Sequence, residues 1–133
     1  MIYWDDAYSI HNKRVDDQHK RFFQLIQTME QAVQGRQGRE VLGAILNELA
    51  DYAIYHFKME EKLFQEHAYP DRTRHMIEHA KMKQKAVELR TDFEAGKMVV
   101  TAELVTFMKH WLTNHILESD MKLGEFLKEK GEI

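Results

Sequence analysis

Apolar residues recur along most of the chain at alternating steps of three and four, which places them on one face of an α-helix. Glycine and proline interrupt this pattern at three places, around Gly35 and Gly38, at Pro70 and at Gly96. The pattern therefore predicts four long helices. We expect them at about residues 16–34, 39–66, 71–94 and 101–118.

Short connections between long helices imply antiparallel neighbours, so the predicted fold is an all-α, antiparallel up-down four-helix bundle. We expect residues 1–15 to form an irregular N-terminal arm. Residues 121–130 would continue the last helix or form a short extra one. A chain of 133 residues can bury a core without disulfides or other staples, so we expect a single domain over 1–133.

The polar exceptions on the four inward stripes are histidines and one glutamate. They are His19 on the first helix, His56 and Glu60 on the second, His75 and His79 on the third, and His115 on the fourth. One such histidine is usually a core residue with a single hydrogen-bond partner. An unpartnered buried polar group costs ~1–3 kcal/mol. Several would consume much of a typical stability of ~5–15 kcal/mol, and a bound cation would compensate them directly.

The spacing of these residues also favours a metal site. His56 with Glu60, and His75 with His79, are four residues apart and share a helix face. Five histidines with carboxylates exceed what one tetrahedral zinc needs, so two ions bridged by carboxylates fit better. Nitrogen-rich sites of this kind suit iron, although other metals stay open. The ExxH motif of ferritin-like proteins and the HExxH motif of zinc proteases are both absent.

The composition of the chain limits the kinds of partner that we expect for the protein. The formal net charge is −3 and no basic run stands out, which argues against nucleic acid. No apolar run approaches the ~18 residues of a membrane span, and the N-terminal stretch lacks the apolar segment of a signal peptide. The chain has no cysteine, which excludes disulfides and thiolate ligands. We therefore expect a cytoplasmic protein with no membrane partner.

Four segments resemble the hemerythrin family, and specifically its single-domain bacterial members. They are VDDQH (15–19), HFKMEE (56–61), HMIEH (75–79) and WLTNHILESD (111–120), in the family's order and spacing. The similarity runs from Trp4 to about Asp120. It implies a four-helix bundle around a non-haem di-iron centre that binds O₂ reversibly.

The resemblance also implies a role for individual residues. His75, His79 and His115 would hold one iron, and His19 and His56 the other. Glu60 and Asp120 would bridge the two irons together with an oxo or hydroxo bridge. The second iron would then have an open position for O₂.

An apolar wall around that open position would slow the entry of water. Phe22, Phe57, Leu112 and Ile116 flank the expected ligands at suitable spacing, and Leu112 matches a leucine of the family pattern. Ordinary core packing explains these four residues equally well. We expect His11 and His110 at the surface and His67 at a helix end, and Glu61 either in solvent or accepting a hydrogen bond from a ligand.

Three functions remain open at this point. The first is reversible O₂ binding for storage, delivery or scavenging, without enzymatic activity. The second is O₂ or redox sensing through a separate signalling partner, because no signalling module is evident. The third is a di-iron oxidase or peroxidase, which usually has more carboxylates and fewer histidines.

The stretch HILESD (115–120) presents a conflict. Periodicity nominates Glu118, three residues past His115, as the acidic partner. The resemblance nominates Asp120, five residues past and about 140° away around an α-helix. The pair converges only if the helix widens or ends, as in a π-bulge. We therefore predict an irregularity between Ile116 and Asp120, with Glu118 pointing away from the metals.

Overall fold

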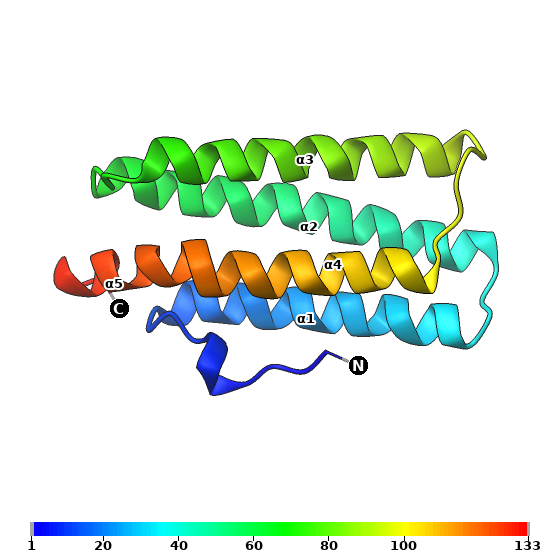
Figure 1. Ribbon diagram of the computed structural model, residues 1–133, viewed down its shortest axis with the longest axis horizontal. Helices are drawn as coiled ribbons and strands as arrows, with labels where there is room; N and C mark the ends of the chain where they lie inside the picture. The colour runs from blue at the N-terminus through cyan, green and yellow to red at the C-terminus, as the bar shows by residue number, and fades with distance from the viewer. Residues whose placement is uncertain (1, 133) are drawn as a thin grey trace.

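The computed structural model describes residues 2–132 and forms an antiparallel bundle of four long helices (Figure 1). They are α1 (Lys13–Gln34), α2 (Arg39–Glu66), α3 (Arg72–Glu94) and α4 (Ala102–His115). None of the described residues forms a strand, so the predicted all-α bundle is confirmed. Within the same residues, no helix has the length and apolar character needed to cross a membrane.

The fourth helix continues without a break in direction beyond His115. A π-helical segment, η2 (Ile116–Asp120), follows α4 and leads into α5 (Met121–Glu129). Figure 1 shows the three segments as one rod that ends beyond the α2–α3 turn. Of the two alternatives expected for 121–130, the structure shows the continuation of the last helix, with a local change of helix type in between.

The N-terminal arm is shorter than expected because α1 begins at Lys13 rather than near residue 16. The side chain of Asn12 accepts a hydrogen bond from the backbone N–H of Val15 at 3.1 Å, which satisfies a free donor of the first turn. The arm contains one short 3₁₀ turn, η1 (Asp6–Tyr8). An asparagine in this position is a start signal that the apolar pattern alone does not register.

The arm is fixed against the end of the bundle by a buried carboxylate. Asp16 accepts hydrogen bonds from the Ser9 hydroxyl at 2.6 Å and from the Ile10 backbone N–H at 2.9 Å. Ile10 is fully buried and lies against Gly124 of α5, where an added Cβ would stand 2.3 Å from the Ile10 carbonyl oxygen. Glycine is therefore required for the close approach of the arm to α5.

The core is unequally filled along α3. Its only buried residues are His75, His79 and Phe93, although Met82, Ala86 and Leu89 continue the same face of the helix at steps of three and four. These three side chains are half-buried and line an apolar cavity of about 80 Å³. They share the cavity with apolar side chains of α1, α2 and α4, such as Ile26 and Leu49. The second half of α3 is thus packed more loosely than its first.

Candidate metal centre

The structure brings all seven predicted metal-site residues together inside the bundle. They are His19 of α1, His56 and Glu60 of α2, His75 and His79 of α3, His115 of α4 and Asp120 of η2. Every one of them is buried. Their ligand atoms form two groups, and Glu60 and Asp120 belong to both. All four long helices and η2 therefore contribute side chains to one polar cluster.

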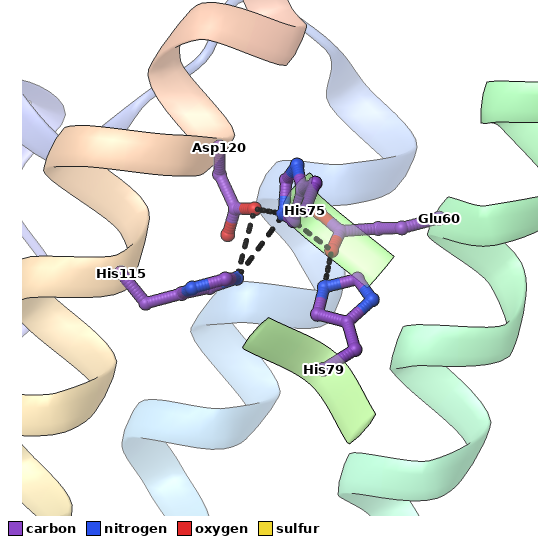
Figure 2. A group of neighbouring side chains, drawn as sticks. All are labelled: Glu60, His75, His79, His115 and Asp120. Carbon is purple, nitrogen blue, oxygen red and sulfur yellow. Dashed lines mark hydrogen bonds and ion pairs between the residues drawn. The ribbon is translucent and has the colours of Figure 1, made fainter. Parts of the chain in front are cut away.

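The first group, which we call the three-histidine position, is shown in Figure 2. The Nε2 atom of His75 lies 2.9 Å from Asp120 Oδ1, and that of His115 lies 3.3 Å from the same oxygen. The Nε2 atom of His79 lies 3.0 Å from Glu60 Oε1. Three ring nitrogens and two carboxylate oxygens thus face a common point.

The second group, the two-histidine position, uses the opposite oxygens of the same carboxylates. His19 Nε2 lies 3.1 Å from Asp120 Oδ2, and His56 Nε2 lies 3.5 Å from Glu60 Oε2. The two Nε2 atoms are 3.2 Å apart. Each carboxylate therefore offers one oxygen to each group, which is the arrangement that bridges two neighbouring cations.

The ligand atoms at the centre of the cluster have the environment expected of groups that bind two cations. Both carboxylate oxygens of Glu60, both of Asp120 and the Nε2 atom of His79 are buried and make no hydrogen bond of regular geometry within the described residues, and their close neighbours are other ligand atoms of the cluster. Buried charges are normally paired or coordinate a metal, because an isolated buried charge is very costly. Imidazole nitrogens and carboxylate oxygens suit transition metals such as iron. The donor set is therefore appropriate for two such ions.

The outer ring nitrogens of three histidines are held by partners that point their Nε2 atoms inward. Glu61 Oε2 lies 2.9 Å from His79 Nδ1, and Glu78 Oε2 lies 3.2 Å from His115 Nδ1. Gln18 Oε1 lies 2.7 Å from His56 Nδ1. A carboxylate or an amide oxygen can only accept a hydrogen bond, so in the neutral ring the proton sits on Nδ1 and the Nε2 lone pair faces the centre.

Sequence reasoning found Glu61 as a candidate partner but missed Gln18 and Glu78. Each of the two directly precedes a histidine of the centre, yet each supports a histidine on another helix. Glu78 is itself held by the Ser119 hydroxyl at 2.7 Å and by an ion pair with Arg74. No sequence signal marks such partners, because their contacts cross between helices.

Aromatic rings cover the histidines from the interior side. Trp111 stacks on His115, with ring centroids 4.6 Å apart, and Phe57 stacks on His79 at 4.3 Å. Phe22 meets His56 edge-on at 5.3 Å.

The apolar cavity begins at these rings. Phe22, Phe57 and Leu112, three of the four predicted pocket residues, line it. Ile116, the fourth, is fully buried in the core but is not among the residues that line the cavity.

The π-helical segment solves the conflict within HILESD. The wider turn of η2 brings Asp120 to the same side as His115, although five residues separate them. Glu118 is exposed to solvent. The predicted irregularity between Ile116 and Asp120, with Glu118 pointing away, is therefore confirmed.

Burial and neighbouring charges shift the pKa values of the carboxylates and histidines in the cluster. Burial opposes ionisation of Asp120, but His115 and the other nearby histidines outweigh it and hold the pKa of Asp120 well below its usual value. The pKa of Glu60 is likewise lowered, because His56 and His79 outweigh burial and the repulsion of Asp120. Burial lowers the pKa of His56. For His115, burial is outweighed by Asp120, which raises its pKa to about 9.

The remaining histidines lie away from the centre, as the sequence predicted. His11 and His110 are exposed. His67 caps the C-terminal end of α2, and its Nε2 atom is 3.9 Å from Glu132.

Known proteins share this sequence pattern and this fold. The family model described as Hemerythrin HHE cation binding domain matches residues 11–127. A hemerythrin-like protein of Naegleria gruberi is 36% identical over 119 residues, which cover 90% of this chain and 87% of that protein. A bacteriohemerythrin of Methylococcus capsulatus is 35% identical over 113 residues, 84% of this chain and 85% of that protein.

The fold gives the same result. A crystal structure of wild-type hemerythrin superposes with a TM-score of 0.91 at 31% identity, covering 96% of this chain and 98% of that one. The family match spans most of the chain, including all seven residues of the cluster. The chain therefore belongs to the hemerythrin family.

Proposed function

We propose that this protein binds O₂ reversibly at a non-haem di-iron centre and so stores, delivers or scavenges O₂. The observation that carries the proposal is the pair of ligand groups that share Glu60 and Asp120. One group has three histidines and the other has two, so the chain encloses one ion more completely than its neighbour. The two-histidine position is the one we propose for O₂.

In this proposal the irons supply the electrons that O₂ needs, and the chain holds, orients and encloses them. His75, His79 and His115 hold one ion, and His19 and His56 hold the other. Glu60 and Asp120 keep the two ions together. Gln18, Glu61 and Glu78 keep the ring protons of their histidines on Nδ1, so that each Nε2 stays available.

Exclusion of water is the second task of the chain. Phe22, Phe57 and Leu112 place only apolar atoms on the cavity side of the centre. O₂ is apolar and enters such a space easily, whereas water finds no hydrogen-bond partner there. We propose that this wall, with Ile116 behind it, protects the ferrous state.

Binding rather than oxidation is favoured by the composition of the centre. It contains five histidines and two carboxylates, whereas di-iron oxidases usually rely on more oxygen ligands, which support higher oxidation states better. A sensing role would use the same site with a separate partner.

Iron content and an optical titration test this proposal together. We expect two irons per chain, matching the two groups, and an absorption band that appears on adding air and disappears on removing O₂. The Asp120→Ala variant serves as a control, because it removes one oxygen from each group. A wild-type preparation with one iron or none would contradict the proposal. Steady turnover of peroxide with a reductant would replace it with the enzymatic alternative.

A further inference from the structure

The outer partners of the histidines differ in charge between the two positions. At the three-histidine position, His79 faces the Glu61 carboxylate at 2.9 Å and His115 faces the Glu78 carboxylate at 3.2 Å. At the two-histidine position, His56 faces the uncharged amide oxygen of Gln18 at 2.7 Å. Among the described residues, the carboxylates that face an outer ring nitrogen thus stand at the three-histidine position.

We propose that Gln18 is a positioning residue whose uncharged side chain keeps the two-histidine position easier to reduce than the three-histidine position. This inference rests on the proposed function. A carboxylate that accepts the Nδ1 proton makes the imidazole a stronger donor, which stabilises the more highly charged ion. An amide oxygen orients the ring equally well but adds no charge. The ion at the open position therefore keeps its ferrous state more readily.

Gln18 is well fixed for this role. It sits on α1, one residue before His19, and reaches across to His56 on α2. Its backbone oxygen accepts a hydrogen bond from the Tyr52 hydroxyl at 3.1 Å. The ring of Phe22 packs edge-on against both Tyr52 and His56, at 5.0 and 5.3 Å. The half-buried amide therefore meets His56 at the edge of a packed aromatic group.

The charge of Glu61 makes it the best counterpart of Gln18. Glu78 shares its carboxylate with Arg74 and Ser119, which offset part of its charge. Glu61 contacts His79 directly, and its side chain is 30% exposed. Glutamate and glutamine have nearly the same shape, so exchanging them at positions 18 and 61 changes charge with little change in packing.

Four variants test the proposal. Gln18→Glu adds a carboxylate at the two-histidine position, and Glu61→Gln removes one from the other position. The double variant moves one carboxylate from the three-histidine position to the two-histidine position, so that each position has one, and leaves the net charge unchanged. Gln24→Glu is the matched control, because Gln24 lies on the same helix but is exposed to solvent.

The main measurement is a redox titration of the iron-loaded protein. We expect Gln18→Glu to lower the ferrous-to-ferric ratio at a fixed potential by roughly tenfold, equivalent to about 59 mV for a one-electron couple. In the double variant, the potentials of the two irons should move towards each other, and the spectrum of the half-oxidised protein should change accordingly. A purely structural role of Gln18 would alter stability but not the difference between the two potentials.

Binding of Co²⁺ to the metal-free protein gives an independent readout. We expect Glu61→Gln to weaken binding at the three-histidine position by about 10–100-fold. Gln18→Glu should not weaken binding. Equal potentials for Gln18→Glu and Gln24→Glu, or an unchanged difference between the two potentials in the double variant, would overturn this inference alone. A wild-type protein that fails to hold two irons would overturn the proposed function, and this inference with it.

Discussion

The two halves of the bundle interior are built on different principles. In the half next to the α2–α3 turn, histidines and carboxylates are buried and held by directional contacts from neighbouring helices. In the other half, apolar side chains such as Ile26, Leu46 and Leu49 fill the space and leave a cavity of about 80 Å³. The polar half depends on the relative positions of individual atoms, whereas the apolar half depends on filling a volume and leaves part of it empty.

The difference is sharpest along α3. The first half of this helix buries His75 and His79, whereas Met82, Ala86 and Leu89 in the second half are only half-buried. Apolar burial therefore contributes less to fixing α3 than to fixing α1 and α2. We infer that metal binding through its two histidines supplies much of what holds α3 in place.

The largest expected effect comes from removing a bridging carboxylate. Asp120→Ala should abolish the paired metal centre, because Asp120 offers one oxygen to each group. Glu118→Ala should leave the metal content unchanged, because Glu118 is exposed. Metal analysis of the two purified variants checks this. If only the Glu118 change lost metal, the assignment of the bridge would be wrong.

Removing the metal itself should be the next largest effect. At a metal concentration 1,000 times the dissociation constant, one bound ion adds about 4 kcal/mol to the free energy of unfolding. A chelator should lower the melting temperature accordingly, and amide hydrogens of α3 should exchange faster than those of the second half of α1. Equal exchange in both helices would show that α3 does not depend on the metal.

A cavity-enlarging change in the apolar half should have a smaller and separate effect. Leu49 is 8% exposed and lines the cavity. Leu49→Ala should reduce the free energy of unfolding by roughly 3 kcal/mol, as lost burial and a larger void predict. Iron content should stay that of the wild type. Urea unfolding and metal analysis measure the two quantities, and a loss of iron would show that the halves are coupled.

The smallest expected effect is a dependence of metal affinity on pH. In the metal-free protein the pKa of His115 is raised to about 9 by Asp120, against the effect of burial, so this ring carries a second proton, on Nε2, at neutral pH. Metal binding must displace that proton. The apparent affinity for Co²⁺ should thus rise by about tenfold per pH unit, roughly 1.4 kcal/mol, between pH 7 and 9. An affinity for Co²⁺ that does not change between pH 7 and 9 would contradict the raised pKa of His115.

The stability of the metal-free protein changes with pH in the opposite direction to its metal affinity. The pKa of His115 is higher in the folded chain than its ordinary value of 6.5, so its protonation stabilises the fold. That contribution is complete below about pH 6.5 and is lost as the pH rises through about 9. The metal-free protein should therefore lose this contribution over the same range in which its metal affinity increases.

Much of the architecture could be predicted from local pattern. The predicted second helix, 39–66, coincides with α2 (Arg39–Glu66), because its apolar period of 3.6 residues and its flanking turn signals are both local properties. The same period placed His56 and Glu60 on one face. It failed at Asp120, where the helix changes type, and only the resemblance to hemerythrins indicated that residue.

The partners of the ligands could not be predicted in this way. Gln18 contacts α2, Glu78 contacts α4, and Glu61 contacts α3, so each pairing depends on how two helices are rotated and shifted against each other. The cavity beside Met82 and Leu89 has the same origin, since those residues fit an inward stripe as well as buried ones do.

The sequence by itself determined the helices, their inward faces and the types of side chain that those faces carry. The tertiary structure alone decided which oxygen faces which nitrogen, which histidines receive charged partners and where the interior is left unfilled. The physical reason is that periodicity is set by neighbours three and four residues apart, whereas these contacts join helices far apart in the chain. Their geometry exists only once the bundle has packed.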